Sequence, residues 1–103
     1  MVPIGATKKT TRIIDDVDDL FSRIQFDVVF HLAARIEAGV SFKEPTEFYS
    51  VNTGGTCNVI NAMVKHGVKN IVFSSTAAVY QASNTPLKED DPKFDNSPYG
   101  NSK

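Results

Sequence analysis

The sequence has little of several features that mark specialised classes of protein. It has one cysteine, Cys57, so no internal disulfide can form, which is typical of a reducing compartment. We expect Cys57 to be buried as a small hydrophobic side chain. No apolar stretch approaches the ~20 residues of a membrane span, and residues 1–9 lack the apolar centre of a signal peptide. We therefore expect a cytoplasmic protein with no membrane partner.

An excess of charge of one sign is missing as well. The sequence has eleven lysines and arginines and twelve aspartates and glutamates, so its net charge is −1. Basic residues form no dense run. Nucleic acids attract proteins through clustered basic residues, so we expect no nucleic-acid partner. We expect no bound metal either. The 103 residues are enough for one domain.

The chain alternates between helix-forming and strand-forming segments. Acidic residues followed by apolar residues at helical spacing predict a short helix over 15–24. Two short apolar runs, 26–34 and 69–75, predict strands that are buried on both faces, as in a parallel sheet. Between them, apolar residues at helical spacing predict a long helix over 45–66. Gly67 then supplies the left-handed residue of a helix end.

The order of these segments predicts the fold class. Residues 81–96 are rich in Pro, Asp, Lys and Asn, which indicates a loop, and Pro98 suits the first turn of another helix. Helices that alternate with buried strands favour an α/β fold with a parallel sheet and right-handed crossovers. We expect residues 1–14 to be irregular and residues 15–103 to form the domain.

Tyr99 and Lys103 have a spacing suited to general-base catalysis. They lie four residues apart, so on a helix they share one face. A free phenol has a pKa of about 10, and a nearby ammonium group lowers such a pKa because it stabilises the phenolate. A tyrosine in this setting can act as a base. Alone, the pattern is more often a core tyrosine beside a solvated lysine.

Three further motifs precede this pair. FHLAA (residues 30–34) ends the first strand in small residues, which let a ligand approach the backbone closely. NTGGT (52–56) places two glycines inside a helix, at ~1 kcal/mol each relative to alanine, a cost that close packing on the sheet would explain. FSSTAAVY (73–80) places hydroxyl groups at the carboxyl end of the second strand, where ligands bind in open α/β sheets.

With these four motifs in this order, the sequence resembles the extended short-chain dehydrogenase/reductase family, and most closely its branch of UDP-glucose 4-epimerases. The resemblance covers about residues 19–103. It implies a Rossmann-type doubly wound parallel sheet, NAD as cofactor, a UDP-hexose substrate and a homodimer. Ala77 and Ala78 follow Thr76 where dehydratases of the family have an acid–base pair, which favours the epimerase branch.

The resemblance also implies roles for single residues. Tyr99 would remove the proton of the sugar 4-hydroxyl, Lys103 would stabilise the phenolate and hold the nicotinamide ribose, and Thr76 would hydrogen bond to the 4-oxygen. The implied reaction is a transient oxidation at carbon 4, in which hydride passes to NAD⁺ and returns to the opposite face of a 4-keto sugar. The residues implied to contact the dinucleotide are Phe30, Ala33, Ala34, Asn52, Ser74, Ser75, Tyr99 and Lys103.

Two parts of the family pattern have no match in this sequence. The family opens with a strand and a G-x-x-G-x-x-G turn that binds the pyrophosphate, whereas Gly5 is a lone glycine. The family's substrate domain would follow Lys103. We therefore expect a central fragment of an NAD-binding domain, without the first strands and the substrate domain, that is inactive alone. Two other interpretations stay open: another nucleotide-sugar reductase or decarboxylase of the family, or a non-catalytic nucleotide-binding remnant.

Overall fold

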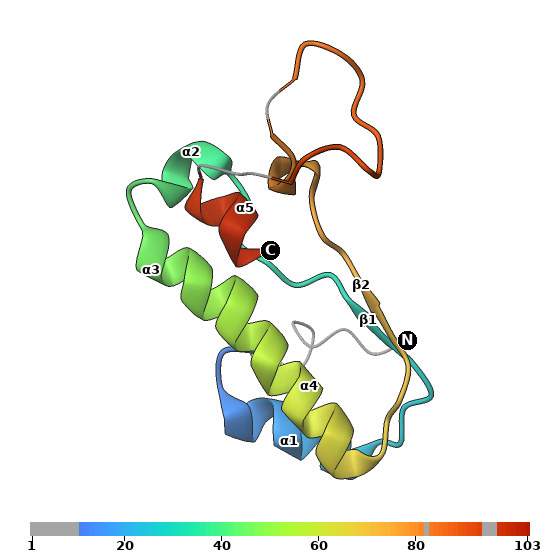
Figure 1. The fold of residues 1–103 in the computed structure, drawn as a ribbon. Helices are drawn as coiled ribbons and strands as arrows, with labels where there is room; N and C mark the ends of the chain where they lie inside the picture. Colours follow the sequence, from blue (N-terminus) through green and yellow to red (C-terminus); the bar gives the residue numbers. More distant parts are fainter. Residues whose placement is uncertain (1–10, 82, 94–96) are drawn as a thin grey trace.

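The computed structural model describes residues 11–81, 83–93 and 97–103 (Figure 1). The predicted N-terminal irregular segment, and Gly5 with it, lies mostly outside the described residues. The elements around the strands are α1 (Ile14–Arg23), β1 (Val29–His31), β2 (Ile71–Phe73), a short 3-10 turn (Ala77–Val79) and α5 (Pro98–Ser102). The elements between the strands are α2 (Ala38–Ser41), α3 (Pro45–Phe48), a π-helical segment (Tyr49–Gly54) and α4 (Gly55–His66).

The long helix predicted over 45–66 is confirmed. Helix α3, the π-helical segment and α4 follow one another without a break, and Figure 1 shows them as one rod. Pro45 occupies the first turn, where its missing N–H is not needed. Gly67 ends the rod at a φ of 72°, a left-handed conformation that glycine adopts without the steric cost of a Cβ.

The two strands form a parallel pair, in which Val29 lies opposite Ile71 and His31 opposite Phe73. The prediction that both faces of the strands are buried is wrong for the described residues. In β1 only alternate residues are covered, so that His31 is buried while Phe30 is 61% exposed. Strand β2 is exposed along its length. The physical reason is that the labelled helices lie to one side of the strands (Figure 1).

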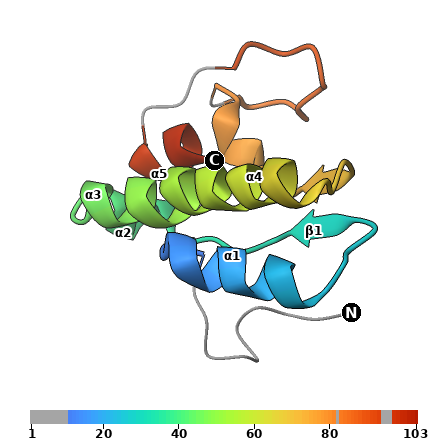
Figure 2. The same cartoon turned by 90° about the horizontal axis from the view of Figure 1, so that it is seen from below.

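The hydrophobic core lies between α1 and α4, which run alongside each other (Figure 2). Two partly buried side chains, Phe26 and Val29, complete it from the side of β1. Burial of these apolar groups supplies the main force that holds α1 and β1 to the long helix. The core residues are Val17, Phe21, Val59, Ala62, Met63 and Val68.

Close packing explains the presence of Gly55, one of the two glycines in the long helix. A Cβ at this position would lie 2.7 Å from Thr11 Oγ1 and 3.2 Å from Thr11 Cβ. The close packing predicted from the sequence is therefore present, but its partner is the segment before α1 instead of the sheet. At Gly54 a Cβ would meet only the Tyr49 carbonyl oxygen, at 3.7 Å.

We expect Gly55→Ala to lower the free energy of unfolding by about 1–3 kcal/mol, because Thr11 must move away from the new methyl group. That movement also strains the hydrogen bond from Asn58 Nδ2 to the Thr11 carbonyl, at 2.8 Å. Gly54→Ala is the matched control, expected to raise the free energy of unfolding by up to about 1 kcal/mol through helix propensity. Urea unfolding compares the two variants, and equal stability would show that Thr11 does not approach Gly55 closely.

Two side chains at the end of α4, Lys65 and His66, bond to Asp18 of α1. His66 Nε2 lies 2.8 Å from the Asp18 carboxylate, and Lys65 Nζ lies 3.0 Å from it. The hydrogen bonds from His66, and then from Lys65, hold the pKa of Asp18 below its usual value. A depressed carboxylate pKa stabilises the folded state above the unfolded pKa, and this stabilisation is lost as the pH falls through the folded pKa.

We therefore expect Asp18→Asn to lower the melting temperature at neutral pH. The difference from the unmodified chain should disappear once the pH has fallen through the folded pKa of Asp18, which lies below 3.8. Thermal unfolding followed from neutral to acid pH measures this. Asp90→Asn, in the exposed loop, is the control and should show no such trend. A destabilisation by Asp18→Asn that is the same at every pH would contradict the assignment.

Candidate functional site

The carboxyl ends of β1 and β2 meet at one edge of the sheet, where both strands continue into small or hydroxyl-bearing residues. The Ser74 N–H donates to the His31 carbonyl at 3.2 Å, which prolongs the strand pairing by one step. Ala33 and Ser75 are exposed, and Ala34 and Ser74 are half-buried. The structure therefore brings these four predicted residues to the edge where open α/β sheets bind ligands.

Thr76 lies at the turn that follows β2. Its Oγ1 accepts a hydrogen bond from the Ala78 N–H at 3.2 Å and so caps the short 3-10 turn. This bond uses a lone pair of the hydroxyl and leaves its hydrogen available for another acceptor. Thr76 is half-buried, so its hydroxyl can meet a ligand at the edge.

Helix α5 begins at Pro98, as predicted, because Ser97 caps it: the Ser97 Oγ accepts from the Gly100 N–H at 3.1 Å. The Tyr99 ring packs edge-on against Phe48, with ring centres 6.2 Å apart. α5 also lies beside the 3-10 turn that Thr76 caps. The structure therefore brings the helix of Tyr99 next to the turn of Thr76.

Lys103 follows the last residue of α5, and its position ties this helix to the strand edge. Its Nζ lies 5.3 Å from the centre of the ring of Phe73, the last residue of β2. A cation over an aromatic face is attracted by the ring electrons. Partial burial holds the pKa of Lys103 below its usual value, since it disfavours the charged form. The Tyr99 ring and the Lys103 ammonium thus have different aromatic neighbours.

A cavity of about 290 Å³ opens between the long helix, β2 and α5. It brings together two predicted residues, Asn52 and Lys103. Cys57 also lines it and is exposed, so the expectation that Cys57 is buried is wrong. The other lining residues are Thr53, Thr56, Phe73, Asn101 and Ser102.

Asn52 is 2% exposed, and its amide group is bonded to the protein. Its Oδ1 accepts from the Arg35 N–H at 2.7 Å, and its Nδ2 donates to the Arg35 carbonyl at 3.0 Å. Nδ2 also donates to Ser102 Oγ at 2.9 Å, so both amide hydrogens are used. A direct bond from Asn52 to the dinucleotide stays a prediction.

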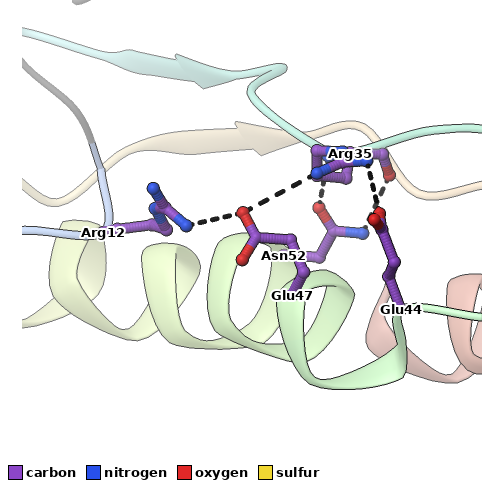
Figure 3. A network of polar contacts seen from close by, with 5 residues as sticks. All are labelled: Arg12, Arg35, Glu44, Glu47 and Asn52. Atoms are coloured by element: carbon purple, nitrogen blue, oxygen red, sulfur yellow. Dashed lines mark hydrogen bonds and ion pairs between the residues drawn. The ribbon is translucent and has the colours of Figure 1, made fainter. Parts of the chain in front are cut away.

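Arg35 fixes the loop after β1 through its side chain as well (Figure 3). Its guanidinium group lies 3.2 Å from Glu44 and 3.7 Å from Glu47, and Arg12 approaches Glu47 at 2.6 Å. It also lies 5.2 Å from the centre of the Phe48 ring. The ion pairs are half-exposed, so each contributes at most about 1 kcal/mol. Arg35 was not among the predicted site residues, because its only signal in the sequence is a cation just after a predicted strand.

His31 lies under the site and is buried. Its Nε2 is 2.8 Å from Thr56 Oγ1, and that hydroxyl donates its own hydrogen to the Asn52 carbonyl at 2.6 Å. Nε2 therefore carries the imidazole hydrogen and donates it to Thr56. Burial, and then the charge of Lys103, hold the pKa of His31 below its usual value, so the ring is neutral at pH 7.

Two further kinds of site can be examined within the part of the chain that the structure describes. There, no three His, Cys, Asp or Glu side chains are grouped so that they could hold a metal ion. Of the helices described, none combines the length and the apolar character needed to cross a membrane.

The sequence profile of the NAD dependent epimerase/dehydratase family matches residues 6–103. The chain belongs to this family. The resemblance inferred from the four motifs is thereby confirmed. The fold class is confirmed with it: the parallel pair β1–β2 and the helices beside it are part of a Rossmann-type α/β fold.

Relatives of known sequence and structure agree with this family. The UDP-glucose 4-epimerase of Halalkalibacterium halodurans is 42% identical over 88 residues, which are 84% of this chain and 26% of that protein. The UDP-Glc/GlcNAc 4-epimerase of Campylobacter jejuni matches 91% of this chain and 29% of that one, with 38% identity and a TM-score of 0.85. The UDP-glucose 4-epimerase of Bifidobacterium longum, solved with NAD⁺ and UDP, has a TM-score of 0.83 at 34% identity and covers 90% and 28%. The chain spans about a quarter of the length of the curated relatives it matches.

Proposed function

We propose that this chain is the central part of an NAD-dependent nucleotide-sugar 4-epimerase that interconverts UDP-glucose and UDP-galactose. The observation that carries the proposal is the meeting of α5 with the sheet edge, where Lys103 lies over the last residue of β2. The 42% identity to the Halalkalibacterium halodurans UDP-glucose 4-epimerase supports the same activity. We assign residues 15–103 to the NAD-binding domain and residues 1–14 to a divergent segment ahead of it.

The side chains at this edge fit the nicotinamide end of NAD. The hydroxyls of Ser74 and Ser75 and the ammonium of Lys103 are hydrogen-bond donors suited to the ribose and to the carboxamide. The small side chains of Ala33 and Ala34 leave room for a planar ring beside the backbone, and Phe30 would line the same surface. These residues would hold the nicotinamide at this edge, where NAD would supply reversible hydride transfer at carbon 4 of the sugar.

The residues of this chain would handle the proton. Tyr99, as phenolate, would take the proton of the 4-hydroxyl and give it back to the 4-oxygen when the ketone is reduced. The Lys103 ammonium would favour the phenolate electrostatically. The Thr76 hydroxyl has a hydrogen left for the 4-oxygen and would hold it in place during both transfers.

We also propose that the full-length parent of this chain is a cytoplasmic homodimer that binds a UDP-hexose. The single cysteine supports the reducing compartment. Two exposed apolar side chains on α4, Ile60 and Val64, support a contact with a second subunit. Light scattering measures the oligomeric state.

A chimera tests the proposed reaction. In it, residues 15–103 of this chain replace the homologous segment of the Halalkalibacterium halodurans epimerase, which then supplies the remaining three-quarters of an epimerase. We expect the purified chimera to bind NAD⁺ and to convert UDP-galactose to UDP-glucose. A folded chimera that binds NAD⁺ without converting the sugar would contradict the proposed function.

A further inference from the structure

Ser102, the residue before Lys103, is held by two successive residues of the long helix. Asn52 Nδ2 donates to the Ser102 Oγ at 2.9 Å, and Thr53 Oγ1 donates to the Ser102 carbonyl at 3.0 Å. Ser102 is 5% exposed, so these bonds are largely shielded from water. The backbone and the side chain of Ser102 are therefore both fixed just where α5 ends.

Asn52 and Thr53 lie within the π-helical segment Tyr49–Gly54. A π-helical turn is rare and occurs frequently at functional sites, because it changes the direction of side chains relative to an α-helix. Here the Asn52 amide makes two hydrogen bonds to the Arg35 backbone, through Oδ1 and Nδ2, while the second hydrogen of Nδ2 reaches Ser102. The segment thereby joins the loop after β1 to α5.

The backbone of Asn52 is anchored from the sheet side. Its carbonyl accepts from Thr56 Oγ1 at 2.6 Å, and Thr56 in turn accepts from the buried His31 of β1. Asn52 is thus connected to β1, to the loop after β1 and to α5. A residue with these three connections can fix the position of α5 relative to the strand edge.

We propose that Asn52, Thr53 and Ser102 form a clamp that positions Lys103 and Tyr99 at the carboxyl edge of the sheet. In this assignment Asn52 is a positioning residue that acts through α5. The catalytic role of the residues that the clamp positions rests on the proposed function. The hydrogen bonds of the clamp do not depend on it.

The clamp matters because Ser102 lies between Tyr99 and Lys103 in the chain. Its bonds to Asn52 and Thr53 join this stretch to the long helix. Without the bonds to Ser102, Lys103 is expected to leave the Phe73 ring and to enter water. Its pKa should then rise toward the usual value, since burial is what lowers it.

The test follows the titration of Lys103 in the 103-residue chain by carbon-13 NMR of labelled lysine. In Ser102→Ala and Asn52→Ala we expect the pKa of Lys103 to rise toward its usual value. We also expect the Lys103 amide, which donates to the Gly100 carbonyl at 3.2 Å, to exchange on the order of tenfold faster. Asn58→Ala is the matched control, because Asn58 donates from the same rod to the Thr11 carbonyl. It should leave the Lys103 titration unchanged.

A Lys103 titration that is the same in Ser102→Ala, Asn52→Ala and the unmodified chain would overturn the clamp. If Asn52→Ala does not fold, Ser102→Ala decides alone, because it leaves the bonds from Asn52 to Arg35 in place. In the chimera, Ser102→Ala should lower kcat more than it changes KM. The NMR titration needs no cofactor or sugar, so an inactive chimera would overturn the proposed function and leave the clamp standing.

Discussion

Tyr99→Phe is expected to lower the kcat of the chimera by about 10²- to 10⁴-fold, the usual contribution of a general base. The substitution removes only the phenol oxygen. The ring and its edge-on contact with Phe48 remain, so the free energy of unfolding and the affinity for NAD⁺ should hardly change. The conversion of UDP-galactose, measured with calorimetric NAD⁺ titration on the same samples, separates loss of chemistry from loss of structure.

Tyr49→Phe is the matched control for this experiment. Tyr49 lies on the long helix and is exposed, and nothing in the structure places it at the strand edge. Its variant should keep the kcat of the chimera. An equal loss of kcat in both variants, or full activity in Tyr99→Phe, would remove Tyr99 from the role of base.

Phe48→Ala is expected to lower the free energy of unfolding by about 3–5 kcal/mol, as for other fully buried phenylalanines. Phe48 is 0% exposed and lies between the Arg35 guanidinium and the Tyr99 ring. Its removal would leave a cavity between the loop after β1 and α5. We therefore also expect a lower kcat in the chimera, because Tyr99 loses its support.

Phe42→Ala controls for the removal of a phenylalanine as such. Phe42 is 59% exposed, and its loss should change the free energy of unfolding by no more than about 0.5 kcal/mol. Urea unfolding gives both values. If Phe48→Ala costs no more than Phe42→Ala, then α5 is not docked on the long helix through Phe48.

Local signals predicted most of the secondary structure. The long helix, the left-handed Gly67 and the start of α5 at Pro98 all depend on residues close together in the sequence. The predicted helix over 15–24 differs from α1 by one residue at each end. These features could be predicted because turns, caps and apolar spacing act over a few residues.

Burial of the strands could not be predicted in the same way. The apolar runs around β1 and β2 predict that both faces of the strands are buried. Whether they are buried depends on packing by elements that are distant in the sequence. Phe30 and Val72 remain exposed because the described helices lie on one side of the strands. The sequence pattern indicates which strand residues are apolar, and only the structure shows which of them other elements cover.

The candidate site likewise combines residues that sequence motifs predict with contacts that form only on folding. Tyr99, Lys103 and Thr76 were predicted from the order of four motifs, a signal that lies in the sequence itself. The partners of Asn52 were not, because its bonds to Arg35 and Ser102 join positions that are neighbours only after folding. The same holds for Thr11 and Gly55.

The central claim is that these residues serve a transient oxidation at carbon 4. Its most direct test follows deuterium placed on carbon 4 of UDP-galactose through the chimera. The account predicts UDP-glucose that keeps the deuterium at carbon 4, because the atom leaves and returns as hydride without meeting water. Exchange of the deuterium with solvent, or no conversion by a folded chimera that binds NAD⁺, would contradict it.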